Sequence, residues 1–290
     1  MRSKLFVPGS RPEWFAKALA SDADAISIDL EDSVVEARKA EARASVSEFL
    51  KSAEALRSGK TFVVRVNAPG TSHFEADVLA ITQPALAMLN LPKAESAEDI
   101  HGAVAVIERA EAANGVRKAT YILANIETPK GLRYAADIAS AHPRVAGLQL
   151  GYFDLFAPFG IDRRDSANVH AAMFAMRIAA SEANRFAYDG AFPDLKDAAG
   201  FREEAERARR LGYAGKSCIH PSQVALANEV FTPSEADVEL ARRVLEAHRE
   251  AEARGVGAFL VDGRMIDAPA IRRAEAILAA SQHTNRGSPT

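Results

Sequence analysis

Short apolar runs alternate with longer amphipathic segments along the first 231 residues, and this rhythm constrains the fold more than any other feature of the sequence. Apolar runs of four to seven residues bounded by Gly and Pro are typical of buried parallel strands, and the amphipathic segments between them are typical of covering helices. The eight runs are Leu5–Pro8, Ala25–Leu30, Thr61–Asn67, Ala87–Leu91, Tyr121–Glu127, Val145–Gly151, Arg185–Tyr188 and Lys216–Ile219. Eight such units predict an α/β fold of the (β/α)₈ TIM-barrel type. A doubly wound open sheet is the alternative, but the sequence has no glycine-rich phosphate loop that would favour it.

The chain after this repeat has a different pattern. Ser234–Arg254 predicts a helix, Ala258–Ile266 predicts a hairpin that turns at Asp262-Gly263, and Ala268–Ala280 predicts a second helix. We therefore expect a barrel over residues 1–231 and a helical and hairpin extension over residues 232–290.

Composition and charge exclude several classes of protein. The 290 residues are 48% hydrophobic and 26% charged, with a formal net charge of −3, so the sequence predicts neither a nucleic-acid-binding surface nor disorder. No apolar stretch approaches the roughly 20 residues that cross a bilayer, and the N-terminal apolar run is too short for a signal peptide. The single cysteine, Cys218, lies in an apolar run and is expected to be a core residue. These features predict a cytoplasmic protein that does not bind membranes.

Two carboxylates stand where an apolar run gives way to a turn, Glu127 after one predicted strand and Asp154 after the next. The carboxyl ends of barrel strands form the ligand-binding face, so both side chains are expected at the same mouth. They could supply hard oxygen ligands to one Mg²⁺ and leave its other positions to water and substrate. Alternatively, they are N-cap or salt-bridge carboxylates of the loops.

Other polar residues follow the predicted strands. Arg65 interrupts a strongly apolar run, and a buried guanidinium needs a carboxylate from a ligand or from the protein. The segment Asp29-Leu30-Glu31-Asp32 places three acids at a strand end, where they are either functional or a solvated cluster. Lys93 could form a Schiff base, but an ion pair with nearby acids fits its context better. His220 either closes the eighth strand or supports the site.

A set of motifs, spread over essentially the whole chain, carries a resemblance to a known family. The motifs are Arg2-Ser3-Lys4-Leu5-Phe6-Val7-Pro8-Gly9, Asp29-Leu30-Glu31-Asp32-Ser33-Val34, Val64-Arg65-Val66-Asn67, Ile126-Glu127-Thr128, Gly151 with Asp154, Gly215-Lys216, Ile219-His220-Pro221-Ser222-Gln223 and Asp262-Gly263-Arg264-Met265-Ile266-Asp267-Ala268-Pro269. In this order they resemble the citrate lyase β-subunit-like branch of the HpcH/HpaI aldolase superfamily, which includes malyl-CoA and citramalyl-CoA lyases.

The resemblance implies a magnesium-dependent lyase on a TIM barrel. Such an enzyme cleaves a carbon–carbon bond of a 3-hydroxyacyl-CoA thioester, such as citramalyl-CoA or malyl-CoA, to give an acyl-CoA and a 2-oxo acid. Carried over by motif, Glu127 and Asp154 are the Mg²⁺ ligands, and Glu127 also adjoins the substrate. Arg65 binds substrate and stabilises the developing enolate oxygen.

The resemblance also assigns catalytic roles to three acids. Asp267, in the extension, is implied to be the acid/base at the enolate carbon, acting in the site of a neighbouring subunit. Glu31 and Asp32 are implied to support metal-bound water and Arg65. The expected assembly is a homotrimer or a multiple of one.

One loop departs from the family pattern. After Asp154 the chain continues Leu155-Phe156-Ala157-Pro158-Phe159-Gly160, where small and acidic residues are usual, so a more apolar and stiffer rim is expected. The acyl substrate is therefore left open. The rival functions are a citryl-thioester lyase β subunit acting on acyl-carrier protein, a malyl-CoA-type thioesterase, and a non-catalytic scaffold that binds CoA or metal.

Overall fold

The computed structural model describes the backbone of residues 1–285 and the side chains of residues 1–281. The chain divides into two compact units, Met1–Asn228 and a second unit that begins at Glu229. Each unit is described by itself below.

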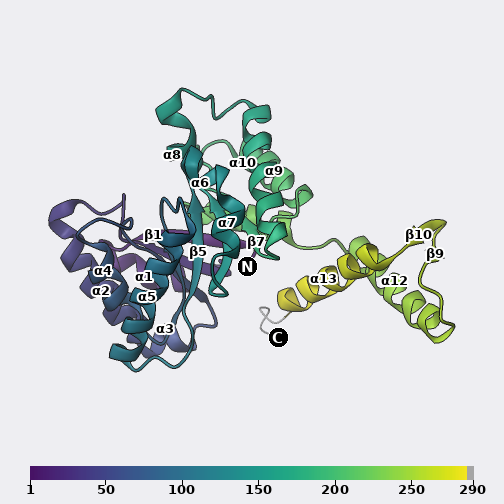
Figure 1. The fold of residues 1–290 in the computed structure, drawn as a ribbon, viewed down its shortest axis with the longest axis horizontal. Helices are drawn as coiled ribbons and strands as arrows, with labels where there is room; N and C mark the ends of the chain where they lie inside the picture. The colour runs from purple at the N-terminus through teal and green to yellow at the C-terminus, as the bar shows by residue number, and fades with distance from the viewer. Residues whose placement is uncertain (286–290) are drawn as a thin grey trace. The chain divides into compact units, whose positions relative to one another are not determined.

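Eight parallel strands form the core of the first unit (Figure 1). The strands are β1 (Ser3–Pro8), β2 (Ala25–Asp29), β3 (Thr61–Arg65), β4 (Leu86–Leu91), β5 (Tyr121–Ile126), β6 (Val145–Leu150), β7 (Phe186–Tyr188) and β8 (Lys216–Cys218). They are hydrogen-bonded in the order β7-β6-β5-β4-β3-β2-β1-β8, and a parallel bridge between Asp189 and Lys216 joins the two ends. The predicted TIM barrel is confirmed, with every strand within two residues of its predicted bounds.

Helices follow the strands as the alternation predicted. The helices of residues 1–231 are η1 (Pro12–Trp14), α1 (Phe15–Leu19), η2 (Glu36–Arg38), α2 (Lys39–Lys51), α3 (Ala53–Arg57), α4 (Phe74–Ile81), α5 (Ala97–Asn114), α6 (Pro129–Arg133), α7 (Ala135–Ser140), α8 (Tyr152–Phe156), η3 (Ala157–Phe159), α9 (Ser166–Glu182), α10 (Ala198–Arg210) and α11 (Pro221–Phe231). Helix α5 begins after Ser96, which forms a reciprocal capping box with Asp99, and it ends at left-handed Gly115.

Two of the segments between strands are divided into shorter helices. The segment after β2 contains η2, α2 and α3, and α2 is separated from α3 because Ser52 adopts an extended conformation and caps α3 with its side chain. The helix after Pro129 is divided at Tyr134, which leaves helical geometry and gives α6 and α7. The sequence pattern also failed to predict α8, the short helix that carries Asp154.

The barrel interior changes from apolar to polar along its axis. Val63, Met88, Leu123 and Tyr188 pack together in a buried cluster. Further toward the carboxyl ends, Asn90 and Asn125 replace these apolar side chains, and the amide of Asn90 donates to the Asn125 oxygen at 3.4 Å. The polar end of the barrel is therefore its carboxyl-terminal mouth, where TIM-barrel active sites lie.

The second unit has its own core. It contains α12 (Glu235–Ala253), a hairpin of β9 (Phe259–Val261) and β10 (Arg264–Ile266), and α13 (Ala268–Asn285). Ile266 packs with Ala241, Val244 and Ala274, so the inner face of the hairpin is covered by the helices. The cross-strand pair Leu260 and Met265 is mostly exposed on the other face.

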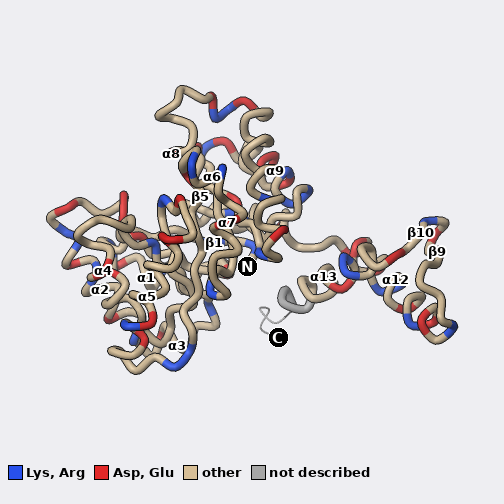
Figure 2. The backbone as a smooth tube through the Cα atoms, viewed as in Figure 1, with Lys and Arg blue, Asp and Glu red and all other residues tan. Residues whose placement is uncertain are grey.

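Acidic and basic residues are interspersed along the backbone of both units (Figure 2). Among the described residues, no helix combines the length and the apolar character needed to span a bilayer.

Candidate active site

Arg65 is the central cation of the barrel mouth. It ends β3 and stands in register with Asp29, the last residue of β2, so the two side chains enter the barrel side by side. The Arg65 Nε and Nη2 atoms donate to the two Asp29 oxygens at 2.7 and 2.8 Å. This bidentate geometry fixes the guanidinium plane. Burial opposes the charge of both groups, but the ion pair lowers the pKa of Asp29 and raises that of Arg65.

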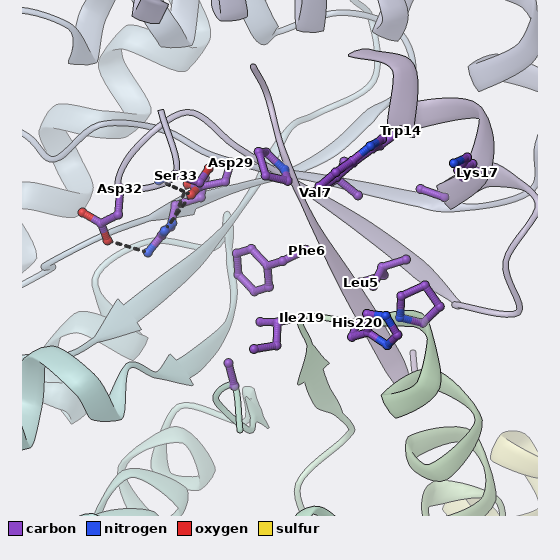
Figure 3. A pocket seen from close by; sticks show the side chains of 15 residues that line it. Leu5, Phe6, Val7, Trp14, Lys17, Asp29, Asp32, Ser33, Ile219 and His220 are labelled. Atoms are coloured by element: carbon purple, nitrogen blue, oxygen red, sulfur yellow. Dashed lines mark hydrogen bonds and ion pairs between the residues drawn. The ribbon is translucent and has the colours of Figure 1, made fainter. Parts of the chain in front are cut away.

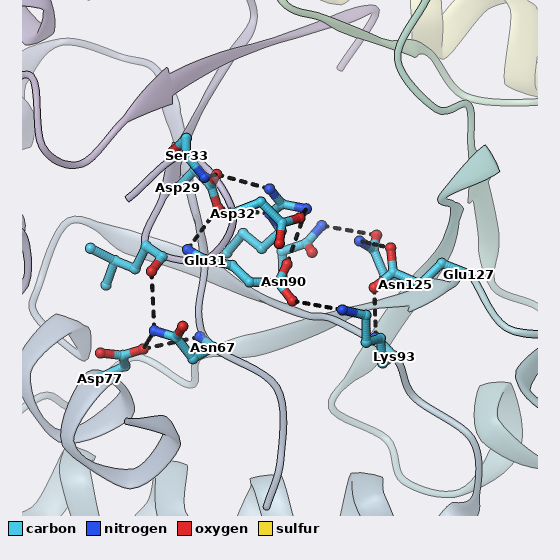
Figure 4. A network of polar contacts seen from close by, with 12 residues as sticks. Asp29, Glu31, Asp32, Ser33, Asn67, Asp77, Asn90, Lys93, Asn125 and Glu127 are labelled. Carbon is cyan, nitrogen blue, oxygen red and sulfur yellow. Dashed lines mark hydrogen bonds and ion pairs between the residues drawn. The ribbon is translucent and has the colours of Figure 1, made fainter. Parts of the chain in front are cut away.

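Glu31 and Asp32, which follow Asp29 in the chain, lie around the edge of the Arg65 guanidinium that Asp29 leaves free (Figure 4). Arg65 Nη1 lies 3.1 Å from Glu31 Oε2 and 3.3 Å from Asp32 Oδ2. Glu31 is buried and Asp32 is exposed, so burial, with the nearby charge of Asp32, raises the pKa of Glu31. The Glu31 Oε2 atom faces Arg65 without the geometry of a hydrogen bond. Asp29 and Glu31 are therefore buried against Arg65, and of the three acids only Asp32 is solvated.

Glu127 follows β5 and is almost fully buried at the same mouth. Its Oε1 atom accepts a hydrogen bond from the backbone N–H of Lys93 at 2.8 Å, and Oε2 accepts one from the Asn125 amide at 3.2 Å. Burial raises its pKa to about 7, and the charges of Glu31 and Asp154 add to the effect. Gly151 lies against this side chain, and a Cβ atom there would overlap the Glu127 carboxylate.

Lys93 connects Glu127 to Asp154. Its backbone is left-handed, with φ of 50°, which directs its N–H to Glu127 while the side chain extends across the mouth. The ammonium Nζ atom lies 3.5 Å from Glu31 Oε1 and 3.7 Å from Asp154 Oδ2. Burial opposes this charge, but Glu31 and Asp154 raise the pKa of Lys93 above its usual value. The predicted ion pair of Lys93 is confirmed.

The carboxylates could hold a cation only with help from other ligands. Within the described residues, no three His, Cys, Asp or Glu side chains are arranged to bind a metal ion alone. The chemically suitable donors are the oxygens of Glu127 and Asp154, which contact the backbone N–H and the ammonium of Lys93, respectively.

A pocket of about 780 Å³ opens beside Arg65 (Figure 3). Its walls are largely apolar and come from β1, α1 and the segment after β8, with Trp14, Lys17 and His220 at its edge. His220 is exposed and its Nδ1 atom pairs with the Ser222 hydroxyl at 2.8 Å. Cys218 is buried in the core as predicted.

The structure thus brings together five of the six predicted site residues in one barrel mouth. They are Glu31, Asp32, Arg65, Glu127 and Asp154. Asp267 belongs to the second unit, where it is exposed and its Oδ1 atom accepts from the backbone N–H of Ala270 in the first turn of α13. Sequence reasoning did not predict Asp29 as the partner of Arg65, although its position at a strand end was a signal.

The rim after Asp154 is less apolar than its sequence suggests. Phe156 turns inward and packs near Tyr152, with 5.9 Å between the ring centroids. Phe159 is 60% exposed and Pro158 is also on the surface. One of the two expected phenylalanines therefore contributes to the core and not to the rim.

Comparisons with known proteins agree with this geometry. The family model described as HpcH/HpaI aldolase/citrate lyase matches residues 2–221. An L-malyl-CoA/beta-methylmalyl-CoA lyase of Cereibacter sphaeroides is 36% identical, over 96% of this chain and 93% of the relative. A (3S)-malyl-CoA thioesterase of the same species is 35% identical, over 92% and 89%.

A solved structure shows the same relationship. Protein CitE from Mycobacterium tuberculosis, in complex with magnesium, acetoacetate and coenzyme A, is 34% identical, with a TM-score of 0.74. The match covers 97% of this chain and 100% of that one. The chain therefore belongs to the HpcH/HpaI aldolase/citrate lyase family.

Proposed function

We propose that this protein is a Mg²⁺-dependent carbon–carbon lyase that cleaves a 3-hydroxyacyl-CoA thioester, such as citramalyl-CoA or malyl-CoA, into an acyl-CoA and a 2-oxo acid. The observation that carries the proposal is the barrel mouth itself, where Lys93 contacts the buried carboxylate of Glu127 through its backbone N–H and the carboxylate of Asp154 through its ammonium. Glu31, which also lies near this ammonium, contacts Arg65 at the same mouth. The malyl-CoA lyase relative and the magnesium and coenzyme A complex of CitE support the reaction type and both ligands.

The residues present fit a divalent cation. Glu31 and Asp154 lie near the Lys93 ammonium, and with the charge of Glu127 they raise the pKa of Lys93, which supports a position that favours positive charge. Glu127 and Asp154 would hold Mg²⁺ through hard oxygen donors, with waters and substrate in its other positions. When bound, the ion supplies Lewis acidity to the oxygens of the 2-oxo acid portion.

Arg65 provides positive charge where the thioester enolate develops. Its bidentate contact with Asp29 holds the guanidinium in place before substrate arrives, so little reorganisation is needed during the reaction. The Nη1 atom, which contacts Glu31 and Asp32, is the part of the guanidinium nearest the remaining polar groups of the mouth.

Cleavage requires removal of the 3-hydroxyl proton and breakage of the bond between the hydroxyl-bearing carbon and the α carbon. Glu31 suits the role of base, because burial raises its pKa above the ordinary value and its Oε2 atom makes no hydrogen bond. Asp32, which is exposed, would keep Arg65 oriented toward the substrate. The products at this stage are the 2-oxo acid and the thioester enolate, whose carbon must then take up a proton.

We propose that Asp267 of a neighbouring subunit donates this proton to the enolate carbon, in a homotrimer or a multiple of one. The exposed cross-strand pair Leu260 and Met265 gives the extension an apolar surface next to Asp267, as a subunit contact would need. The barrel over residues 1–231 and the extension over residues 232–290 would then each contribute part of every active site.

The apolar pocket beside Arg65 suits the carrier of the acyl group. Its volume of about 780 Å³ is within the range of pockets that bury a large part of a cofactor-sized ligand. Lys17 and His220 at its edge could meet the phosphate groups of coenzyme A. This arrangement favours CoA over a protein-bound thioester, and it fits a cytoplasmic enzyme that uses soluble thioesters.

A thioesterase is the second candidate, because one relative has that name. Incubation of the protein with a panel of malyl-CoA and citramalyl-CoA, with Mg²⁺ or with EDTA, separates the two by mass spectrometry. We expect acetyl-CoA and a 2-oxo acid in the Mg²⁺ samples and no turnover in EDTA. Free CoA together with the intact hydroxy acid would instead indicate hydrolysis, and unchanged activity in EDTA would contradict the role of the metal.

Cation binding is expected to depend on pH around neutrality. Glu127 must be ionised to bind the ion, and its pKa of about 7 lies far above the ordinary value. Below this pKa, the affinity for Mg²⁺ should fall about tenfold for each pH unit, and above it the affinity should level off. Calorimetric titration with Mg²⁺ at several pH values measures this dependence, and an affinity independent of pH would contradict it.

The same pKa has a consequence for stability. A carboxyl whose pKa is raised by folding stabilises the folded protein below its unfolded-state pKa, and this contribution is lost as the pH rises through about 7. Mg²⁺ should therefore raise Tm more at about pH 8 than at about pH 6.

A further inference from the structure

A buried cluster of charged and phenolic side chains lies where β7 and β8 close the barrel, outside the chemistry described above. We call Tyr152, Arg163, Asp189, Glu204 and Lys216 the closure cluster. Lys216 is fully buried, and its three ammonium protons have three acceptors: Asp189 Oδ2 at 2.6 Å, Glu204 Oε1 at 2.5 Å and the Gly190 carbonyl at 3.0 Å. Burial disfavours its charge, but the two carboxylates raise the pKa of Lys216 above its usual value.

Tyr152 and Arg163 connect the segment 152–163 to the carboxylates of Asp189 and Glu204. The Tyr152 hydroxyl donates to Asp189 Oδ1 at 2.6 Å. Arg163 contacts both oxygens of Glu204, at 2.7 and 2.8 Å, and its guanidinium carbon lies 3.9 Å from the centre of the Tyr152 ring. Two cations balance two carboxylates, so the closure cluster is satisfied internally. Such a network holds its members rigidly, because a shift of one member leaves a buried charge unpaired.

The two attached residues stand on either side of Asp154. Tyr152 is the first residue of α8, in the same helical turn as Asp154, and Arg163 follows the left-handed Gly160 that ends the segment. The structure thus ties residues 152–163 to the closure cluster at both ends. The Asp154 side chain is itself one-third exposed. Among the described residues, it forms an ion pair with Lys93, at a long distance of 3.7 Å. The placement of α8 therefore decides where the Asp154 carboxylate lies.

We propose that the closure cluster sets the position of Asp154, so that Tyr152 and Arg163 act as positioning residues for the cation site. This inference rests on the proposed function, in which Asp154 holds a divalent cation. Residues that orient a metal ligand commonly change metal affinity by 10–100-fold when they are altered. Loss of the Tyr152 hydroxyl would free the first turn of α8 from Asp189 without removing any charge from the cluster.

The test is Tyr152→Phe in the full-length protein, with Tyr213→Phe as the matched control. Tyr213 is also buried and also donates one hydrogen bond, but to the Met173 carbonyl at 2.8 Å and not to the closure cluster. Mn²⁺ serves as the probe because it favours the same oxygen ligands as Mg²⁺, and paramagnetic resonance distinguishes its free from its bound form. We expect about tenfold weaker Mn²⁺ binding in Tyr152→Phe, wild-type binding in Tyr213→Phe, and similar small losses of Tm in both.

A second variant, Arg163→Lys, keeps the charge and removes the paired contact with Glu204. It should also weaken Mn²⁺ binding, but by less than Tyr152→Phe does. Wild-type Mn²⁺ affinity in both Tyr152→Phe and Arg163→Lys would overturn the positioning role and leave the proposed function standing. A wild-type protein that binds no Mn²⁺ would overturn both.

Discussion

Glu127→Gln is expected to remove Mg²⁺ binding and to lower kcat by about 10³-fold, which corresponds to roughly 4 kcal/mol of lost transition-state stabilisation. The neutral amide supplies one weak oxygen donor in place of a charged carboxylate. It also cannot accept from both the Lys93 N–H and the Asn125 amide, because one end of the glutamine group is itself a donor. The remaining oxygen would therefore be displaced from its present position.

The thermal stability of Glu127→Gln without metal should not fall, although its activity and Mg²⁺ binding do. Glu127 is a buried acid whose pKa is raised by burial and by the charges of Glu31 and Asp154, so its neutral replacement relieves repulsion in the absence of metal. We expect Tm without Mg²⁺ to be equal to or above that of the wild type, which excludes unfolding as the cause of inactivity. Steady-state kinetics measures the loss of kcat, and calorimetric titration with Mg²⁺ measures the loss of metal binding.

Glu95→Gln is the matched control for this variant. Glu95 lies near the same mouth but is partly exposed and pairs with Lys130 at 3.2 Å, outside the site. This change should leave kcat and Mg²⁺ affinity within about twofold of the wild type. If Glu127→Gln behaved like Glu95→Gln, the metal-dependent mechanism would be wrong.

Asp267→Asn is expected to lower kcat by about 10²–10⁴-fold, the range for loss of a general acid, while Mg²⁺ binding is retained. The reason for this separation is that Asp267 lies in the second unit, whereas Glu127 and Asp154 lie in the first. Asp262→Asn is the control in the same hairpin. Asp262 pairs with Arg243 at 2.7 Å on the exposed surface, and its loss should leave activity intact.

A mixture of the two inactive variants tests whether sites are shared between subunits. When Glu127→Gln and Asp267→Asn chains are co-expressed in equal amounts, a shared site is intact only if its barrel comes from an Asp267→Asn chain and its extension from a Glu127→Gln chain. Random assembly of two variants should therefore restore about one quarter of the wild-type activity. Failure to recover activity, in mixed oligomers verified by native mass spectrometry, would show that Asp267 does not act in a neighbouring barrel.

Local patterns in the sequence predicted the fold because strand and helix signals are local. The eight apolar runs became the eight strands, and the amphipathic segments between them became helices. The ends of strands also placed Arg65, Glu127 and Asp154 at one mouth, since parallel strands in a barrel present their carboxyl ends on the same face. The roles of these residues stay predictions until the variants are measured.

Other features depended on residues far apart in the sequence. Arg65 finds Asp29 across 36 residues, and Lys93 reaches its acids only because its backbone is left-handed. The short helix α8 was not predicted, because its five residues are held by tertiary contacts of Tyr152 and not by helix-forming signals of their own.

Local patterns in the chain were enough to predict a barrel with acids and one arginine at the carboxyl ends of its strands, because hydrophobic periodicity and turn residues act over a few positions. Packing between distant segments settles which of those groups pair, which remain available at the mouth, and how the helix of Asp154 is attached to the closure cluster. These outcomes depend on burial and on distances between different strands, and no local pattern in the chain contains that information.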